Sequence, residues 1–188
     1  MKSLTSSLYL SEKTVFTAPE VALLWQETNS DNLKSKIGYY VKSGVLRSPR
    51  RGIYILVGKE YDKFEMANRL FVPSYVSLET VLLKEGVIFQ YYESIFSISY
   101  HTREVLVDSH NYIYRCVNPK ILNNPIGIIN IGNYSIATKE RAFLDNIYLY
   151  GPHHFDNLRS MDWDLCRRIL PIYHSKQIEK HFLTYVQS

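Results

Sequence analysis

Seven lysines and arginines near the amino terminus lie in a stretch without a single Asp or Glu. They are Lys34, Lys36, Lys42, Arg47, Arg50, Arg51 and Lys59. Ammonium and guanidinium groups form charge-assisted hydrogen bonds to phosphate oxygens, so a cluster of this kind favours a phosphate-bearing partner. Residues 1–59 have nine Lys and Arg against four Asp and Glu, whereas residues 60–188 have thirteen against fourteen. This asymmetry predicts a localised anionic partner, most simply nucleic acid, although a solvated lysine face would leave the same pattern.

Acidic and histidine residues offer a second type of chemistry, the metal site of a nuclease. The candidates are Asp108, His110, His153, His154 and Asp156. Their spacing supports such a site poorly, because the first two fall in a predicted turn and the histidine pair follows Gly-Pro in a loop. Nucleophile elbows and glycine-rich nucleotide loops do not occur in the sequence. We therefore expect no catalytic residue, no metal and no cofactor, and keep a metal-dependent nuclease as the lesser alternative.

The bulk composition limits the class of protein. Cys116 and Cys166 lie far apart without the Cys-x-x-Cys spacing of a zinc site, and each falls in an apolar pattern. We expect two buried thiols and no disulfide. No apolar run reaches the roughly 20 residues of a membrane-spanning helix, and the start lacks the apolar core of a secretion signal. A cytoplasmic protein without a membrane partner is therefore expected.

The elements that must carry the basic residues follow from the apolar spacing. Thr17 and Glu20 form a capping box that begins a short helix, Ala18 to about Gln26. A second helix is predicted from about Ser30 to Ser43, because its apolar residues recur at i, i+4, i+7 and i+8, and a glycine follows it. These apolar residues are Leu33, Ile37, Tyr40 and Val41.

A basic hairpin is predicted directly after the second helix. Two short apolar strands, Val45–Arg47 and Gly52–Leu56, flank a basic turn that contains Pro49 and ends at Gly52. With an earlier helix around Leu4–Ser11, this order is that of a winged helix-turn-helix. We predict a DNA-binding domain over residues 1–60, with base contacts from the start of the second helix and backbone contacts from lysines and the wing. The candidate contacts are Ser30, Asn32, Lys34, Ser35, Lys36, Tyr39, Lys42, Arg47, Arg50 and Arg51.

Residues 61–188 have the alternating signals of a mixed α/β domain, so the overall fold class is predicted to be α+β. Helices are expected after Ser77 and Thr138 and over 162–170 and 175–186. Strand pairs are expected around Asp108–Asn111 and around the hairpin signal Gly132-Asn133. The result is a twisted sheet flanked by helices.

Three segments carry a resemblance to a known family. They are Arg51–Ile55, Tyr75–Leu82 with Gly86–Ile88, and Ala137–Asp145, the last being similar to an Ala-x-x-Glu-Arg-Ala-Leu-Leu-Asp helix. In this order they resemble the AbiEi-like antitoxins of type IV toxin–antitoxin and abortive-infection systems. The last segment departs from the family's pattern, with Lys139 in place of the expected proline.

The resemblance implies a bacterial repressor that binds its own promoter through the winged helix. It also implies that the second domain counteracts a nucleotidyltransferase toxin, by direct contact or without it. A single winged helix needs a second copy for ordinary operator specificity, so we expect either a homodimer on DNA or cooperative loading on repeats. The principal alternative is a winged helix that binds another protein, with an incidental basic wing.

Overall fold

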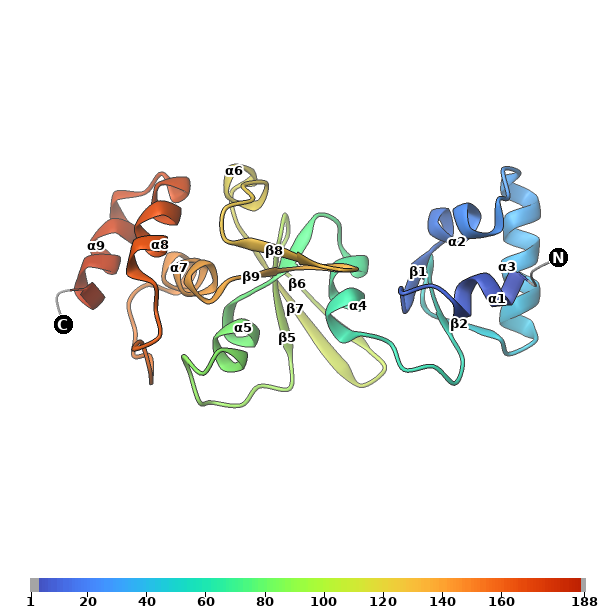
Figure 1. The fold of residues 1–188 in the computed structure, drawn as a ribbon, viewed down its shortest axis with the longest axis horizontal. Helices are drawn as coiled ribbons and strands as arrows, with labels where there is room; N and C mark the ends of the chain where they lie inside the picture. The colour runs from blue at the N-terminus through green and yellow to red at the C-terminus, as the bar shows by residue number, and fades with distance from the viewer. Residues whose placement is uncertain (1–3, 187–188) are drawn as a thin grey trace. The chain divides into compact units, whose positions relative to one another are not determined.

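Two compact units make up the chain, residues 1–70 and residues 71–188. The computed structural model describes residues 4–186, which form nine α-helices and two β-sheets (Figure 1). This mixture is the α+β class predicted from the sequence. The first unit extends beyond the predicted boundary at residue 60, because helix α4 (Lys63–Leu70) packs against strand β1 (Val15–Thr17).

The first unit alternates short helices with a small antiparallel sheet. Its other elements are α1 (Leu4–Tyr9), α2 (Ala18–Trp25), α3 (Ser30–Lys42), β2 (Leu46–Arg50) and β3 (Ile53–Leu56). Strand β3 is central, and β1 and β2 pair with it on either side. The three predicted helices and the hairpin are therefore confirmed as elements. Strand β1 was not predicted, because three residues are too few to establish a period of two.

The core of this unit takes at least one side chain from each element between α1 and β3. These side chains are Leu8, Phe16, Val21, Trp25, Ile37, Leu46 and Leu56. None of them is more than 6% exposed. Burial of a large apolar side chain stabilises a fold by about 1.5–3 kcal/mol. Each short element is thus held by its contribution to one shared core, since helices of this length are marginal alone.

The second unit contains one six-stranded sheet and the remaining helices. Its elements are β4 (Ser74–Val76), α5 (Leu78–Lys84), β5 (Ile95–Ser99), β6 (Arg103–Val107), β7 (His110–Cys116), α6 (Pro119–Leu122), β8 (Ile128–Ile131), β9 (Tyr134–Ala137), α7 (Lys139–Tyr150), α8 (Trp163–Ile169), the 3-10 helix η1 (Leu170–Tyr173) and α9 (Lys176–Val186). The strand order is β6-β7-β5-β4-β9-β8, with β5 parallel to β7 and β4 parallel to β9. As predicted, this unit combines a sheet with helices.

Helix α7 connects the sheet with the carboxy-terminal helices. It packs on α5 and β9 and also on α8 and α9. Figure 1 shows α7 between the strand β9 and the pair α8 and α9. The predicted hydroxyl cap is present, since the Thr138 Oγ1 accepts from the backbone N–H of Arg141 at 3.2 Å. The last turn ends at Tyr150, before the predicted stop at Gly151.

The two cysteines differ in exposure, contrary to the expectation of two buried thiols. Cys166 is buried, and burial raises the pKa of its thiol to about 12. Cys116 is exposed at the end of β7, where its thiol donates to the carbonyl oxygen of Tyr100 at 2.9 Å. The apolar pattern of β7 failed here because alternate residues of a strand point to opposite faces. Both cysteines are free.

Two local expectations for the second unit are corrected by the structure. The turn between β6 and β7 consists of Asp108 and Ser109, both in the left-handed region with φ of 50° and 68°, and β7 already begins at His110. The hydroxyl of Ser77, which was expected to cap α5, donates instead to the buried carboxylate of Asp145 at 2.8 Å. The free-energy cost of leaving a buried carboxylate without hydrogen-bond donors is larger than the cost of leaving a helix end without a side-chain cap.

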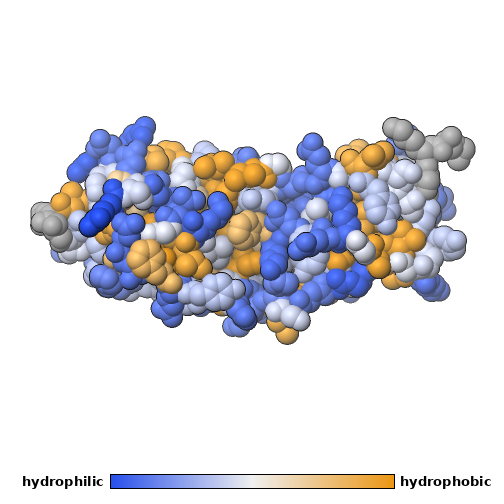
Figure 2. Space-filling view, turned by 60° about the horizontal axis from the view of Figure 1, so that its bottom comes forward, coloured by the Kyte–Doolittle hydropathy of each residue, from blue (hydrophilic) through white to orange (hydrophobic). Residues whose placement is uncertain are grey.

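The surface is predominantly hydrophilic on the face drawn in Figure 2, where polar side chains separate several smaller apolar areas. Within residues 4–186, none of the helices combines the length and the apolar character that crossing a membrane requires.

Candidate nucleic-acid interface

Helix α3 presents a polar face to solvent because its other face is held in the core. Asn29 caps the first turn, where its Oδ1 accepts from the backbone N–H of Asp31 at 2.9 Å and of the next residue at 3.0 Å. Ile37 is 5% exposed, and Leu33 and Tyr40 pack against the core. The exposed face carries six of the ten predicted contacts: Ser30, Asn32, Lys34, Ser35, Tyr39 and Lys42. All six are exposed, and Ser35, Tyr39 and Lys42 lie on the side of the helix opposite its core residues.

Gly38 lies in the middle of this polar face, and the sequence pattern did not single it out. Its helical neighbours at i±3 and i±4 include Lys34, Ser35 and Lys42. A Cβ atom built on Gly38 would meet no atom within 4 Å beyond its chain neighbours and the backbone of its own helix. Glycine in a helix interior costs about 0.5–1 kcal/mol relative to alanine. The chain therefore gives up helix stability at a point where a side chain would fit, and the resulting flat spot permits close approach of another molecule.

The three lysines of α3 have different surroundings. Lys36 is half-buried and pairs with Glu27 in the turn before the helix, and this hydrogen bond lowers the pKa of the Glu27 carboxyl. Lys34 lies 3.3 Å from Asp31, but both side chains are exposed, and such pairs contribute little. Lys42 is exposed in the last turn of the helix. Lys34 and Lys42 are thus accessible to phosphate, whereas Lys36 would first have to leave its ion pair.

The hairpin after α3 has a tighter turn than predicted. Between the pairs formed by Arg47 and Arg50, strand β2 has one residue more than β3, which is a β-bulge. Pro49 lies in this bulge, where its missing N–H breaks no ladder bond, and the Ser48 hydroxyl donates to the carbonyl oxygen of Arg50 at 2.9 Å. The turn itself is only residues 51–52, not the five residues from 48 to 52 that were predicted.

The three arginines of the hairpin remain near the surface. Arg47 and Arg51 are exposed and Arg50 is half-buried. Strand β2 is an edge strand of its sheet, so these side chains border solvent on the side that no other strand covers. Charged residues, a proline and a bulge are typical of edges that avoid pairing with another chain. Arg47 and Arg51 are exposed enough to reach a phosphate backbone, and Arg50 is so only in part.

The positive charge of the chain belongs to the first unit. Residues 1–70 contain eleven Lys and Arg and seven Asp and Glu, and residues 71–188 contain eleven of each. The formal net charge of +4 is therefore the charge of the first unit alone. The net charge therefore attracts anions to the first unit, while the second unit is formally neutral as a whole.

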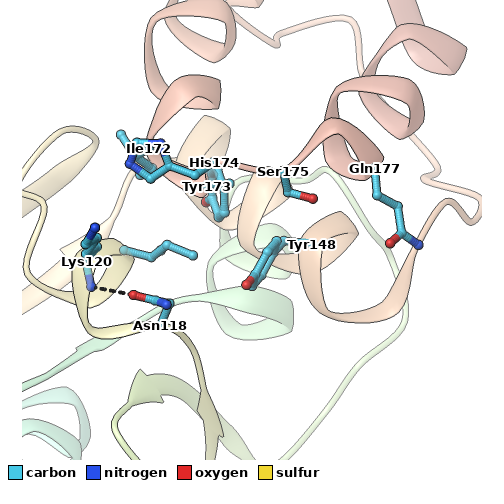
Figure 3. A pocket seen from close by; sticks show the side chains of 9 residues that line it. Asn118, Lys120, Tyr148, Ile172, Tyr173, His174, Ser175 and Gln177 are labelled. Carbon is cyan, nitrogen blue, oxygen red and sulfur yellow. Dashed lines mark hydrogen bonds between the residues drawn. The ribbon is translucent and has the colours of Figure 1, made fainter.

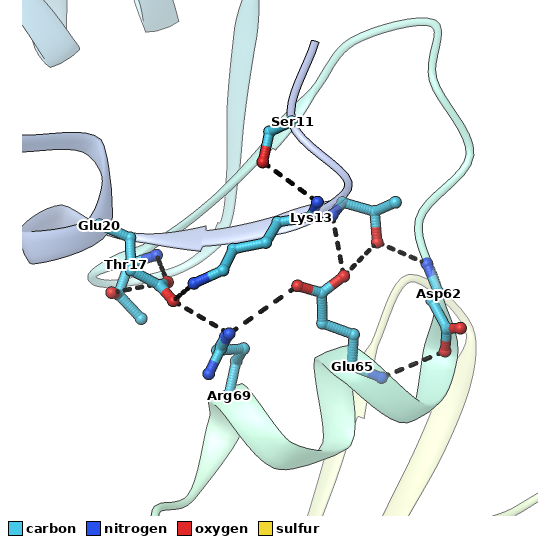
Figure 4. A network of polar contacts seen from close by, with 8 residues as sticks. Ser11, Lys13, Thr17, Glu20, Asp62, Glu65 and Arg69 are labelled. Atoms are coloured by element: carbon cyan, nitrogen blue, oxygen red, sulfur yellow. Dashed lines mark hydrogen bonds and ion pairs between the residues drawn. The ribbon is translucent and has the colours of Figure 1, made fainter. Parts of the chain in front are cut away.

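A network of ion pairs and hydrogen bonds, which the sequence did not reveal, joins α4 to β1 and α2 (Figure 4). Arg69 Nη2 lies 2.9 Å from Glu20 Oε1, to which Lys13 also donates. Glu65 Oε2 accepts from the backbone N–H of Thr14 at 2.8 Å and from its hydroxyl at 2.7 Å. Arg69 and Glu65 approach to 4.0 Å. These contacts attach α4 to the first unit.

The two carboxylates of this network have pKa values shifted in opposite directions. Burial favours the neutral form of both. For Glu20, the hydrogen bonds from Lys13 and Thr17 outweigh burial, so its pKa is lowered. For Glu65, which is 1% exposed, burial outweighs the hydrogen bonds from Thr14 and the charge of Arg69, so its pKa is raised.

The acidic and histidine residues considered for a metal site are distributed over separate loops. Asp108 lies in the β6–β7 turn, and His153, His154 and Asp156 lie in the loop after α7. The closest approach is 3.8 Å between His154 Nε2 and Asp156 Oδ1. In the described part of the chain, no three His, Cys, Asp or Glu side chains are placed so that they could hold one metal ion.

Comparison with known proteins gives no assignment, since no protein-family model and no curated protein sequence matches the chain.

Proposed function

We propose that the first unit is a winged helix that binds double-stranded DNA, with α3 in the major groove and the β2–β3 hairpin on the adjacent backbone. The observation that carries this proposal is that an exposed polar helix face is followed directly by a hairpin with three arginines. Both lie in the unit that holds all the net positive charge. The element order α1-β1-α2-α3-β2-β3, with a three-stranded antiparallel sheet, supports it.

The dimensions of α3 support the same proposal. Thirteen residues at 1.5 Å each give a helix of about 20 Å, and a helix fits the major groove, which is about 12 Å wide. Asn32 and Ser35 provide donors and acceptors of the length that base edges require, and Lys34 and Lys42 would contact phosphates. Arg47, Arg50 and Arg51 would contact the flanking backbone.

We propose further that the whole chain is a cytoplasmic antitoxin that represses its own operon and counteracts a nucleotidyltransferase toxin. This step rests on the three segments that resemble AbiEi-like antitoxins. Two of them, Tyr75–Leu82 and Ala137–Asp145, supply the buried groups that join β4 and the residue before α5 to α7, because Tyr75 and Ser77 both donate to Asp145. The segments are therefore parts of one structural centre in the second unit.

DNA binding is tested by fluorescence anisotropy with the duplex upstream of the gene and a scrambled duplex, over a range of salt concentrations. We expect tighter, salt-dependent binding to the upstream duplex. Replacement of Arg50 and Arg51 by alanine should make the slope of log affinity against log salt shallower by about 1.8, since each lost phosphate contact removes about 0.9. Equal weak binding to both duplexes would favour the protein-binding alternative.

A matched control separates the hairpin from general charge loss. Arg167 and Arg168 are adjacent, exposed arginines on α8 in the second unit. Their replacement by alanine removes the same charge but should leave the salt slope unchanged. If both double variants lowered the slope equally, the hairpin would not be a specific contact.

The antitoxin role is tested by co-expression with an adjacent nucleotidyltransferase gene. The toxin alone should stop growth, and the full chain should restore it, while a reporter under the upstream DNA should be repressed. Growth arrest that persists with the full chain expressed would contradict the antitoxin role without bearing on DNA binding.

A further inference from the structure

A pocket of about 580 Å³ opens in the second unit, between α6, α7 and the segment from η1 to the start of α9. Figure 3 shows Lys120 and Asn118 on one side of it and Ser175 and Gln177 on the opposite side, with Tyr148 between them. Its volume falls within the range of about 300–1,000 Å³ typical of small-molecule sites. Neither the DNA-binding surface nor the antitoxin proposal uses this pocket.

One buried ion pair fixes two walls of the pocket. Arg141 and Asp145 are completely buried on α7, with Nε and Oδ1 3.2 Å apart. Arg141 Nη2 donates to the carbonyl oxygen of Ile121 at 2.8 Å, and Asp145 Oδ1 accepts from the hydroxyl of Tyr173 at 2.6 Å. Ile121 and Tyr173 both line the pocket. The pocket is therefore preformed, and a ligand would not have to order its walls, which favours affinity.

The pocket lining favours an anion. No Asp or Glu is among the nine lining residues, whereas Lys120 supplies a cation. Hydroxyl groups of Tyr148 and Ser175 and the amide of Gln177 add neutral donors around the same space. Lys120 can pair with a phosphate on its side of the pocket, and Ser175 and Gln177 on the opposite side offer neutral donors to another part of the same ligand. A cationic ligand would find no carboxylate here.

The remaining lining suits a planar or apolar body. Ile121 and Ile172 are 1% and 7% exposed and supply the apolar side chains of the pocket lining. The ring of Tyr148 lies 5.1 Å from that of Tyr173, so two aromatic rings contribute to one wall. Aromatic rings offer flat surfaces on which a nucleobase can stack. The backbone of His174, at the end of this wall, is left-handed with φ of 46°.

We propose that this pocket binds a small phosphorylated molecule with a planar body, of the nucleoside monophosphate class. Lys120 pairs with the phosphate, and the ring of Tyr148 contacts the planar part. All nine lining residues belong to the second unit, whereas the proposed DNA contacts belong to the first.

The proposal is tested by calorimetric titration of the full chain with AMP, with adenosine and inorganic phosphate as the two partial ligands. AMP should bind saturably, and adenosine at least tenfold more weakly, because it lacks the charge. Lys120→Ala should weaken AMP binding about tenfold. Tyr148→Leu should weaken AMP binding more than inorganic phosphate binding.

Two control variants establish whether AMP binds in the pocket or at cations elsewhere on the chain. Lys180→Ala removes an exposed cation of α9 outside the pocket lining and should leave AMP binding unchanged. The variant with Arg50 and Arg51 replaced should also bind AMP normally, which separates the pocket from the basic first unit. Absence of saturable binding at about 10 mM AMP, equal affinity for adenosine, or an unaffected Lys120→Ala variant would each overturn the proposal.

Discussion

Gly38→Ala should stabilise the first unit and weaken its binding to DNA. Beyond its own helix backbone and chain neighbours, a Cβ atom at this position meets nothing within 4 Å, and the backbone is helical, so the methyl group introduces no clash. The gain is the difference in helix propensity, about 0.5–1 kcal/mol in the free energy of unfolding. For a unit of 70 residues this corresponds to a rise in melting temperature of about 2–8 °C.

The same methyl group would lie between Ser35 and Lys42 on the face that is proposed to enter the groove. If DNA approaches the α3 backbone closely there, the added volume separates the two surfaces and lowers affinity. Affinity is measured by anisotropy with the upstream duplex, and stability by thermal unfolding of the same preparation. A useful control is Leu23→Ala on α2. Leu23 is 79% exposed and lies outside α3, so this variant should not alter the affinity for DNA.

The two measurements refute different steps. If Gly38→Ala were no more stable than the wild type, Gly38 would not destabilise α3 as expected. A variant that is more stable but binds with unchanged affinity would remove Gly38 from the interface and argue against a close approach of DNA at the middle of α3.

Three further predictions concern buried groups. Burial raises the pKa of Glu65 in the folded state, so the stability that its neutral carboxyl contributes is lost as pH rises from the usual Glu pKa through the raised one. Over this pH range Glu65→Gln should therefore gain stability relative to the wild type. A difference in urea unfolding that does not change with pH would contradict this. Asp145→Asn should destabilise the second unit by about 3–5 kcal/mol, because it leaves Arg141 buried without its counter-charge, and a loss below about 1 kcal/mol in urea unfolding would speak against it. A thiol reagent should modify Cys116 in the folded protein and Cys166 only on unfolding, and two equally fast reactions in native buffer would be inconsistent with the described burial.

The sequence predicted elements whose signals are local. Helix α3 was predicted from its apolar period and following glycine, and β8 and β9 from the hairpin signal between them. The bulge in β2 was missed, because a proline next to basic residues is equally typical of a turn. Strand β4 was missed because it has only three residues, although it lies in the middle of the six-stranded sheet.

Buried polar contacts could be predicted from the sequence only where the two residues are close together along the chain. Arg141 and Asp145 are four residues apart on a helix, so their pairing can be anticipated. Tyr75, however, is 70 positions from Asp145, and Thr14 is 51 positions from Glu65. No period or motif connects such residues, and their relation depends on how the sheet and helices pack. Most of the exposed face of α3 was predicted correctly because it is the complement of a local apolar stripe, but Val41, expected within that stripe, is 36% exposed.

Attachment of α4 to β1 has a practical consequence for dissecting the chain. Ending a fragment at residue 60 would delete Glu65 and Arg69. Thr14 would lose the carboxylate to which its N–H and hydroxyl donate, and Glu20 would lose one of its two cations. The same truncation would also delete Met66 and Leu70, two side chains that the folded chain buries, and so uncover the β1 surface that α4 covers. A fragment that ends at residue 70 keeps the buried network, and it is therefore the fragment that should fold, remain monodisperse and report on DNA binding without the second unit.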